Sequence, residues 1–295
     1  MRRREAVNGW IFLSPWLIGM AVFTVGPIIA SAVISTTQWN LLDPPTFVGL
    51  DNYSRLASDP DFLNSVRVTV TYVLIGVPVF QVAGLALSLL LNLKLRGMRF
   101  FRTVMFLPAV LSGVAVAVLW MQLLNENGAI NQVLRGLGFS DPPGWLTSPF
   151  WAIPAVIVIG VWGVGAGAII YLSGLQNIPP QLYEQAMIDG AGPVRSFFSV
   201  TLPLLTPTLL FTLLTGIIGA FQVFDLAFIL GGPRGGAGGS LSFYLLYVWS
   251  EAFRNGRFGY ASALAWIFVV VAAAIIVVIL KTSNRWVHDE SGGER

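Results

Sequence analysis

Six long stretches without a charged residue limit what this chain can fold into more than any other feature. They cover residues 6–42, 68–93, 103–125, 142–183, 196–224 and 258–280. A helix needs about 20 apolar residues to cross the hydrocarbon core of a bilayer. Within lipid, backbone groups must be hydrogen-bonded internally, which a helix achieves and a single strand does not. We therefore predict an all-α polytopic membrane protein with six transmembrane helices, near 10–36, 70–92, 103–124, 152–173, 206–230 and 260–280.

Composition excludes several other classes of protein. Only 11% of the residues are charged, against about a quarter in a soluble domain, and the mean hydropathy is +0.75. The absence of cysteine excludes disulfides, thiolate metal sites and thiol catalysis. Both lysines, Lys94 and Lys281, follow leucine, so no Gly-Lys phosphate-binding loop is possible. We expect no cofactor and no metal, and we interpret His288, beside Asp289 and Glu290, as part of a solvated tail.

The basic residues indicate how the chain is oriented in the membrane. If the N-terminus is cytoplasmic, the inside segments hold 11 basic residues and the outside loops at 37–66, 125–150 and 231–258 hold 6. An excess of Lys and Arg marks the cytoplasmic side. We therefore predict a cytoplasmic segment at 1–9, a first helix that is longer than the apolar core of a signal peptide and is not cleaved, and a cytoplasmic tail at 282–295.

A polar segment between the fourth and fifth predicted helices has an unusual density of turn residues. After two prolines, residues 181–189 have a helical pattern, and Gly190 stands where a helix ends in the left-handed conformation. A second short helix is predicted at 193–200, with Phe197 and Phe198 facing the bundle. The expected result is two short helices joined at a glycine turn on the cytoplasmic side.

This segment resembles the EAA loop of permease subunits in binding-protein-dependent ABC importers. The resemblance rests on the spacing of Glu184, Ala186, Gly190, Val200, Leu202 and Pro203. The sequence departs from the family pattern at Gln185, in the second position, and at Val200, where isoleucine is usual. Both departures are mild.

The resemblance extends over nearly the whole chain and is closest to the sugar-uptake branch, the maltose and glycerol-phosphate type. It includes "FLSPWLIG" (12–19), "FVGLDNYSRL" (47–56), "RTVMFLPAVLSGVAVAVLW" (102–120), "NGAINQVL" (127–134), "IIYLSGLQNIPPQLYEQAMIDGA" (169–191), "FQVFDLAFILGGP" (221–233) and "GRFGYASALAW" (256–266). The 221–233 motif is two residues shorter than is usual in relatives. The resemblance implies a type I importer fold, with a five-helix transmembrane domain at 66–281 that includes the coupling loop 179–206.

What the resemblance implies about function is specific. Such a permease is a non-catalytic subunit in a bacterial or archaeal cytoplasmic membrane, where it pairs with a second, related permease. Two copies of an ATPase drive it, and an extracytoplasmic binding protein delivers the sugar. The EAA loop fits a groove on the ATPase, where Glu184 would meet a basic group and Gly190 would let the turn lie close. The implied coupling residues are Glu184, Ala186, Asp189, Gly190, Leu202 and Pro203.

A sugar pathway needs polar groups for hydroxyls and aromatic faces for the ring. Gln222 and Asp225 are spaced to share one helix face, and a carboxylate within a span should face the bundle or water. Asp225 could instead be a structural partner of a neighbouring helix. Ser112, Gly113, Trp162 and Gly165 stand where relatives line the pathway, although a tryptophan in a span more often serves packing.

Three alternatives remain open from the residues. An ion-coupled carrier would need ionisable groups within the spans, and Asp225 is the only strong one. A membrane-embedded enzyme would need a nucleophile, metal ligands or an acid–base pair, but no span contains two ionisable residues. An importer permease for a solute other than a sugar would have the same coupling loop.

Overall fold

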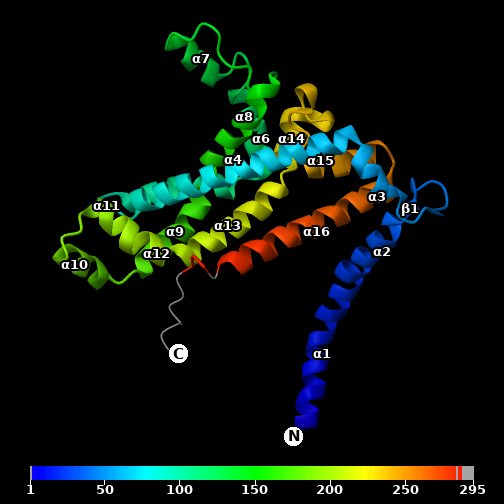
Figure 1. Cartoon of the computed structure of the whole chain (residues 1–295), viewed down its shortest axis with the longest axis horizontal. Helices are drawn as coiled ribbons and strands as arrows, with labels where there is room; N and C mark the ends of the chain where they lie inside the picture. The colour runs from blue at the N-terminus through cyan, green and yellow to red at the C-terminus, as the bar shows by residue number, and fades with distance from the viewer. Residues whose placement is uncertain (1, 284, 288–295) are drawn as a thin grey trace. The chain divides into compact units, whose positions relative to one another are not determined.

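The computed structural model describes residues 2–283 and 285–287, and nearly all of its regular structure is helical (Figure 1). The two strands described, β1 (Thr37–Gln38) and β2 (Thr46–Phe47), form one short antiparallel pair. The interpretation of His288, Asp289 and Glu290 as a solvated tail lies outside the described residues. Contacts divide the chain into two compact units: the first comprises Met1–Pro60 and Val248–Val271, and the second Asp61–Tyr247 and Ala272–Arg295.

Three segments are long and apolar enough to cross a membrane as one helix. The first, Trp10–Ser35, consists of the later part of α1 (Arg2–Met20), a π-helical turn at Ala21–Val25 and α2 (Gly26–Ser35). The other two are α4 (Pro60–Leu91) and α16 (Phe258–Ser283). Three further candidates are pairs of helices bent at a short break. If each bent pair counts as one span, the described residues contain up to six candidate spans by length and composition. Five of them overlie the predicted ranges, but the remaining one covers 193–221 and not the predicted 206–230.

Each bent pair consists of two helical segments that meet at a break of a few residues. Helix α5 (Met98–Phe106), with a 3-10 turn to Val110, meets α6 (Gly113–Leu123) at 100°, and α8 (Pro149–Trp162) meets α9 (Gly165–Asn177) at 49°. The segment Pro193–Leu204 meets α13 (Thr206–Phe221) at 66°. The remaining helices are α3 (Asp51–Arg55), α7 (Ala129–Gly136), α10 (Pro180–Ile188), α11 (Pro193–Ser196), α12 (Leu202–Leu204), α14 (Asp225–Gly231) and α15 (Tyr244–Trp249).

Local backbone geometry describes two of the interruptions. In the third predicted span, Pro108 lies in the 3-10 turn, and Leu111 and Ser112 are extended before α6 begins. The Ser112 hydroxyl then accepts a hydrogen bond from the Ala115 amide at 3.3 Å, as an N-cap residue does. The fifth predicted span, 206–230, is also two helices, because Phe224 leaves the helical conformation with φ −130° and ψ −59°.

Small residues let the helices of the second unit pack closely. A Cβ on Gly160 of α8 would collide with the Phe80 ring of α4, and one on Gly84 would lie 3.3 Å from the Tyr171 ring of α9. Membrane helices commonly associate through such small residues, because lipid offers no hydrophobic drive between helices. Here the missing side chains make room for large aromatic rings from a neighbouring helix.

A buried polar network joins three helices of the second unit. The Tyr171 hydroxyl of α9 donates to Oε1 of Gln81 in α4, and the Thr212 hydroxyl of α13 donates to the Tyr171 oxygen at 2.7 Å. Gln81 Nε2 donates in turn to the backbone carbonyl of Leu209 at 3.2 Å. Because buried polar groups without partners are costly, this network favours one relative placement of α4, α9 and α13.

The first unit is held together around the end of α2. Trp266 Nε1 of α16 donates to the Ser31 hydroxyl at 3.2 Å, and the Phe258 amide donates to the Trp39 carbonyl at 2.9 Å. Gly259 lies so close to the Thr37 carbonyl that a Cβ would collide with it. The start of α16 is therefore packed against the α2–β1 junction.

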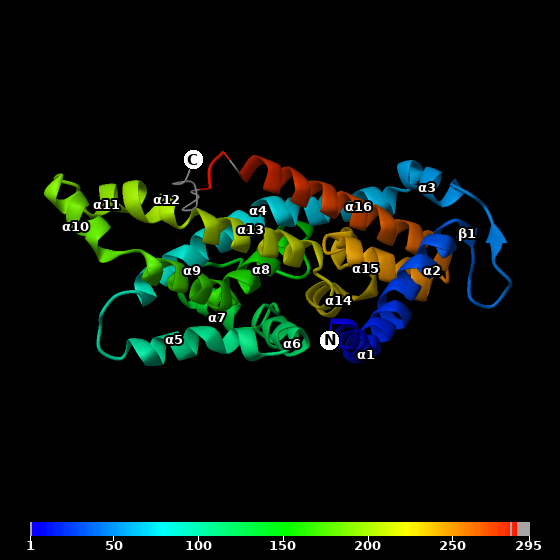
Figure 2. The same ribbon diagram turned by 90° about the horizontal axis from the view of Figure 1, so that it is seen from below.

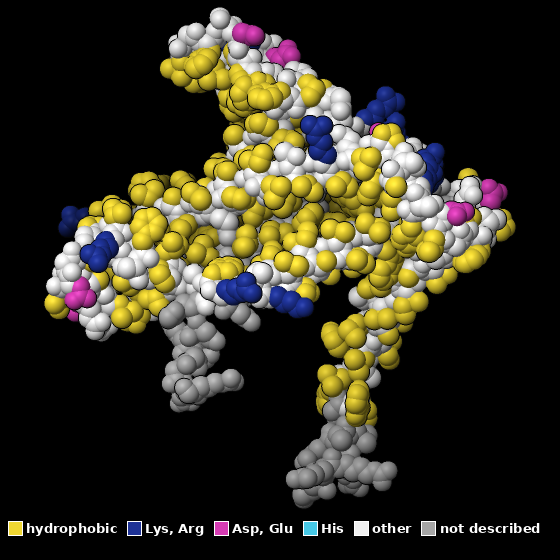
Figure 3. All heavy atoms as spheres, in the orientation of Figure 1, with side chains coloured by type: hydrophobic (Ala, Val, Ile, Leu, Met, Phe, Trp, Pro, Cys, Tyr) yellow, Lys and Arg dark blue, Asp and Glu magenta, His cyan; other side chains and the backbone are white. Residues whose placement is uncertain are grey.

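Apolar side chains are exposed along the candidate spans, as lipid contact requires. In the 18-residue apolar window of Trp10–Ser35 no residue is buried, and Phe12 is 86% exposed. Figure 3 shows hydrophobic side chains over most of the face that it draws. Soluble monomers rarely expose apolar patches of this extent, so the surface agrees with the membrane location predicted from composition.

Candidate functional site

The segment between α9 and α13 has the two short helices and the glycine turn that the sequence predicts. Helix α10 ends at Ile188, and Gly190 follows with φ +76°, the left-handed conformation. The Ala191 amide donates to the Ala186 carbonyl at 2.8 Å, which closes the turn. The second helix continues from α11 through a π-helical turn into α12 and ends at Leu204, four residues later than predicted. We call residues 178–205 the elbow.

The elbow is fixed to the helices on either side of it. The Tyr183 and Thr201 hydroxyls are hydrogen-bonded at 3.0 Å, which joins α10 to the second helix. Leu175, Ile178 and Leu205 form a buried apolar cluster, against which Leu182, Tyr183, Val200 and Leu204 pack. Figures 1 and 2 both show α10, α11 and α12 at one end of the second unit, beyond α9 and α13. The elbow is therefore packed directly against these two helices.

The outer face of the elbow combines exposed apolar and acidic side chains. Met187 is 63% exposed and Ile188 85%, and Glu184 is exposed on the same helix. Ala186, Asp189 and Pro203 line a cavity of about 470 Å³ between the two short helices. Leu202 is half-buried beside Pro203. The elbow thus offers a knob and a hollow, which suit a partner surface with apolar and basic groups.

The prediction that Phe197 and Phe198 both face the bundle is wrong. Phe197 is half-buried, but Phe198 is 62% exposed, and the two rings contact each other edge to face at 5.1 Å. Consecutive residues in a helix point about 100° apart, so two neighbours do not share one face.

A second group of sequence-predicted residues meets where α6 and α14 pack together. The Asp225 carboxylate, in the first turn of α14, lies 3.0 Å from the point where a Cβ on Gly113 would stand. Ser112 caps the same end of α6. The free amide groups and the dipole at a helix N-terminus favour a nearby carboxylate. The structure therefore brings Ser112, Gly113 and Asp225 into one junction, with Asp225 exposed.

Gln222 does not share a helix face with Asp225, so that sequence prediction is wrong. The helix stops at Phe221, and Gln222 lies in the turn that precedes α14, with φ −97° and ψ 15°. The spacing rule for residues three apart applies only within a continuous helix. Gln222 is exposed in this turn, close to Asp225 along the chain but not aligned with it by helical geometry.

Packing accounts for the last two predicted pathway residues. The Trp162 ring lies edge to face against Trp120 with centroids 5.9 Å apart. Gly165 begins α9 directly beside α5, where a Cβ would collide with the Met105 carbonyl. Trp162 therefore packs against α6 through Trp120, and Gly165 packs against α5.

Sequence reasoning missed a polar cavity in the first unit. Its volume is about 610 Å³, and its lining comes from two segments about 200 residues apart, 38–55 and 255–260. The motifs "FVGLDNYSRL" and "GRFGYASALAW" each contain part of its lining, but nothing in the sequence showed that they meet. Local patterns do not show such a cavity, because it depends on tertiary contacts between α16 and the end of α2.

Comparison with known proteins connects these features to a family. Residues 58–289 match the family described as binding-protein-dependent transport system inner membrane component. The probable ABC transporter permease protein YesP of Bacillus subtilis is 38% identical over 99% of this chain and 95% of its own length. The lactose transport system permease protein LacF of Rhizobium radiobacter is 36% identical over 93% of both chains. The trehalose/maltose transport system permease protein MalF of Thermococcus litoralis is 34% identical over 96% of both chains.

Two solved structures share the fold. A chain of a bacterial ABC transporter involved in the import of alginate has a TM-score of 0.80 and 24% identity, covering 97% of this chain and 99% of that one. A chain of a bacterial alginate ABC transporter, in complex with an alginate pentasaccharide-bound periplasmic protein, has a TM-score of 0.83 and 23% identity over 96% of both chains. At these identities the likeness shows the fold alone.

The close contact at Gly165 gives a testable prediction about stability. Gly165→Ala should lower the free energy of unfolding by about 1–3 kcal/mol, because the new methyl group meets the Met105 backbone. Gly167→Ala is the matched control in the same helix, since nothing lies within 4 Å of its added Cβ. It should stabilise by about 0.5–1 kcal/mol through helix propensity. Thermal unfolding of the purified variants, followed by tryptophan fluorescence, measures both, and equal melting temperatures would contradict the packing role.

Proposed function

Since this chain belongs to the family of binding-protein-dependent transport system inner membrane components, we propose that it is the permease through which an ATP-driven importer takes up a sugar. As a member of this family, the chain is a multi-pass inner membrane protein. It is the permease subunit of an ABC importer and is not itself an enzyme. A binding protein and an ATPase are its partners by the nature of such systems. An ion-coupled carrier and a membrane-embedded enzyme do not fit this family.

The sugar assignment rests on one observation, the names of relatives that align over more than nine-tenths of both chains. They are permeases for lactose, for trehalose or maltose, and for multiple sugars, from two bacteria and an archaeon. Mono-, di- or oligosaccharides, and related polyols or sugar phosphates, are the substrate class we propose. A permease for a solute of another class is the remaining alternative.

We further propose that the complete importer contains a second related permease, two copies of the ATPase and an extracytoplasmic sugar-binding protein. The elbow would be its point of attachment to the ATPase. The exposed Glu184 would face a basic group there, while the apolar tip at Met187 and Ile188 would be buried in the groove. Ala186, Asp189, Gly190, Leu202 and Pro203 would shape the contact.

The contacts of the elbow support a direct mechanical route into the bundle. The Tyr183–Thr201 bond makes the two short helices one body, and the Leu175–Ile178–Leu205 cluster joins that body to α9 and α13. Tyr171 then links both helices to α4 through the buried network. Movement of the ATPase would thus tilt these helices together rather than deform the elbow alone.

The proposed substrate pathway includes the α6–α14 junction. Non-helical backbone at membrane depth is tolerated where it is buried in protein or lines a water-filled cavity. Ser112 and Gln222 both stand at such breaks, and Asp225 supplies an exposed carboxylate beside them. A pathway role for Trp162 and Gly165 stays a prediction, because their packing against Trp120 and Met105 is enough to account for these residue types.

The proposed organisation places residues 1–9 in the cytoplasm, a first helix at 10–36, the five-helix domain at 66–281 and a cytoplasmic tail at 282–295. Helix α4 begins at Pro60, so the second span extends beyond the proposed start of that domain. Both termini would lie inside, with the elbow facing the cytoplasm.

Coupling can be tested at the turn of the elbow. Gly190→Val forces a β-branched residue to φ +76°, which costs about 1–3 kcal/mol, so uptake should fall about tenfold or more. Gly192→Val is the matched control, because Gly192 has φ −72° and open space around it. The measurement is ATP-driven uptake of lactose and trehalose per assembled importer in vesicles that contain the binding protein. Equal uptake in both variants would remove the coupling role, and no uptake of any tested sugar by the wild type would refute the sugar assignment.

The junction residues can be tested by the same uptake assay over several sugars and concentrations. Asp225→Asn and Gln222→Ala should each weaken apparent affinity from a few-fold to about a hundredfold, since a lost hydrogen bond costs about 0.5–1.5 kcal/mol, and up to about 3 for a charged group. Basal ATP hydrolysis should not change. If Asp225 only stabilises the start of α6, the variant will be less abundant, but the affinity and sugar preference of what remains will be those of the wild type.

Orientation can be tested with single cysteines, because the chain has none. Ser58→Cys and Ser140→Cys lie at exposed positions in the proposed outer loops, and Ser199→Cys at an exposed position of the elbow. An impermeant maleimide should label the first two in intact cells, and Ser199→Cys only after the membrane is opened. Labelling of Ser199→Cys in intact cells would reverse the proposed orientation.

A further inference from the structure

The polar cavity of the first unit is a candidate binding site outside the coupling elbow and the α6–α14 junction. Its volume of about 610 Å³ falls within the range of about 300–1,000 Å³ that is usual for small-molecule sites. It lies among the β1–β2 hairpin, α3 and the start of α16. The lining side chains that the argument uses are Gln38, Trp39, Asp51, Arg55, Arg257 and Tyr260.

The chemistry of the lining favours a neutral ligand rich in hydroxyl groups. Arginines contribute several N–H donors, carboxylates contribute acceptors, and amide side chains contribute both. The two arginines, Arg55 and Arg257, are balanced by Asp43 and Asp51, so the cavity does not select a simple anion or cation. Trp39 adds an aromatic surface of the kind against which the apolar face of a sugar ring packs.

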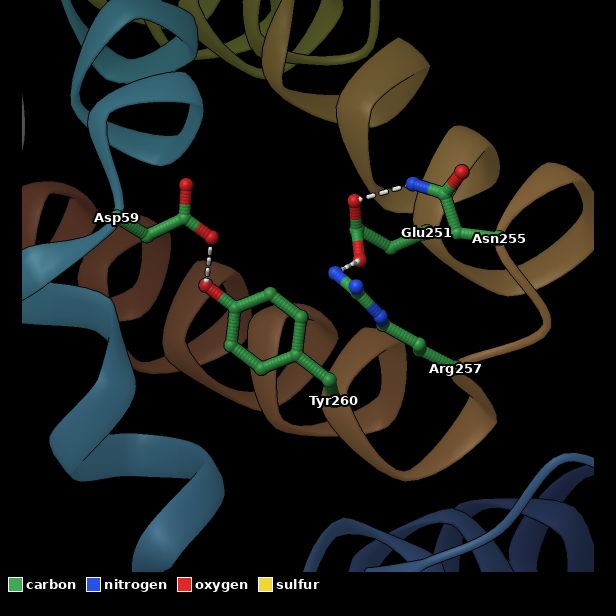
Figure 4. A network of polar contacts seen from close by, with 5 residues as sticks. All are labelled: Asp59, Glu251, Asn255, Arg257 and Tyr260. Carbon is green, nitrogen blue, oxygen red and sulfur yellow. Dashed lines mark hydrogen bonds and ion pairs between the residues drawn. The ribbon is translucent and has the colours of Figure 1, made fainter.

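Polar contacts hold several residues of the cavity lining in place, and Figure 4 shows those of Tyr260 and Arg257. The Tyr260 hydroxyl donates to Asp59 Oδ2 at 2.7 Å, and the Arg55 guanidinium lies 4.7 Å from the centre of the Tyr260 ring. Arg257 is paired at 3.3 Å with Glu251, a carboxylate that is only 4% exposed. Asn255 Nδ2 donates to the other oxygen of Glu251 at 2.7 Å. Arg257 is therefore held by Glu251, and Arg55 lies over the ring of Tyr260, which is itself held by Asp59.

Lining residues of the β1–β2 hairpin and of α3 are held by hydrogen bonds as well. Trp39 Nε1 donates to the Asp43 carbonyl at 2.9 Å, and Asn40 accepts from the Leu42 and Asp43 amides while donating to the Asp43 carboxylate at 2.8 Å. Asn52 Nδ2 donates to the Ser35 and Thr37 carbonyls at 2.8 Å each. A site that is ordered in advance loses less entropy on binding than one that must be assembled.

Several polar groups of the lining remain available to a ligand. The side chains of Gln38 and Asp51 are exposed and have no hydrogen-bond partner among the described residues. The Arg257 side chain is 49% exposed although it is paired with Glu251, and a guanidinium has five N–H groups. The cavity therefore offers uncommitted donors and acceptors on a fixed frame.

From these observations we propose that the cavity is a carbohydrate-binding site of the permease, separate from its transport pathway. Gln38, Asp51 and the two arginines would hydrogen-bond sugar hydroxyls, and Trp39 would contact the ring. The choice of a sugar over other hydroxylated ligands rests on the proposed function. In the proposed orientation, the 37–66 and 231–258 loops place this site on the outer side of the membrane, where sugar arrives.

The test measures binding without transport. The importer is purified in lipid nanodiscs through a tag on this chain, without the binding protein, and titrated calorimetrically with lactose, trehalose and an arabino-oligosaccharide. Asp51→Asn, Gln38→Ala and Trp39→Ala should each weaken binding of at least one sugar about tenfold, and Trp39→Phe should restore much of the loss at that position. Asp141→Asn, which removes an exposed carboxylate from another proposed outer loop, is the matched control and should bind as the wild type does.

The outcomes separate this proposal from the proposed function. Weaker binding in the cavity variants, with unchanged binding in Asp141→Asn, supports the site whether or not the importer carries the same sugar. Wild-type affinity in all three cavity variants overturns it, as does the absence of any sugar binding without the binding protein. Gln38→Ala keeps the test decisive if Trp39→Ala fails to assemble, because the Gln38 side chain has no described hydrogen bond to lose.

Discussion

Lipid offers no hydrogen bonds, so each backbone polar group of this chain that lies in the membrane must find a partner within the protein. The long helices α4 and α16 meet this requirement over most of their length, and the amide missing at Pro78 of α4 removes one helical hydrogen bond. The chain departs from it at short breaks, and two of these breaks adjoin the same junction. There, Ser112 caps α6, and the carboxylate of Asp225 lies beside Gly113.

The same requirement explains the connected set of polar side chains that joins α4, α9 and α13 in the second unit. Gln81, Tyr171 and Thr212 come from three helices, and each satisfies another. This network lies on α9 and α13, the helices against which the elbow packs. The part of the chain that would meet an ATPase is therefore attached to the same helices that the network holds together. A permease needs this combination, because a handle that moved independently of the helices would transmit no work to the pathway.

Periodicity and turn chemistry were sufficient to predict the elbow. Two prolines, a helical stretch and Gly190 define a helix start and stop locally, and the structure has both with φ +76° at the glycine. Local rules failed where neighbours decide. Phe198 is exposed because only one of two consecutive aromatics fits the packed face, and Gln222 lost its predicted alignment because the helix ends at Phe221. Nothing in the sequence near Gly165 indicates that the Met105 carbonyl occupies its side-chain space.

The sequence by itself determined that this chain is a helical membrane protein with six apolar segments, since charge-free length and backbone hydrogen bonding in lipid leave no other solution. It also indicated the family, because the spacing of the elbow residues resembles that of the EAA loop. The tertiary structure alone decided which polar residues meet, and that segments 38–55 and 255–260 line one cavity. These features depend on contacts between residues far apart in the chain, and the energy of such contacts does not appear in any local pattern.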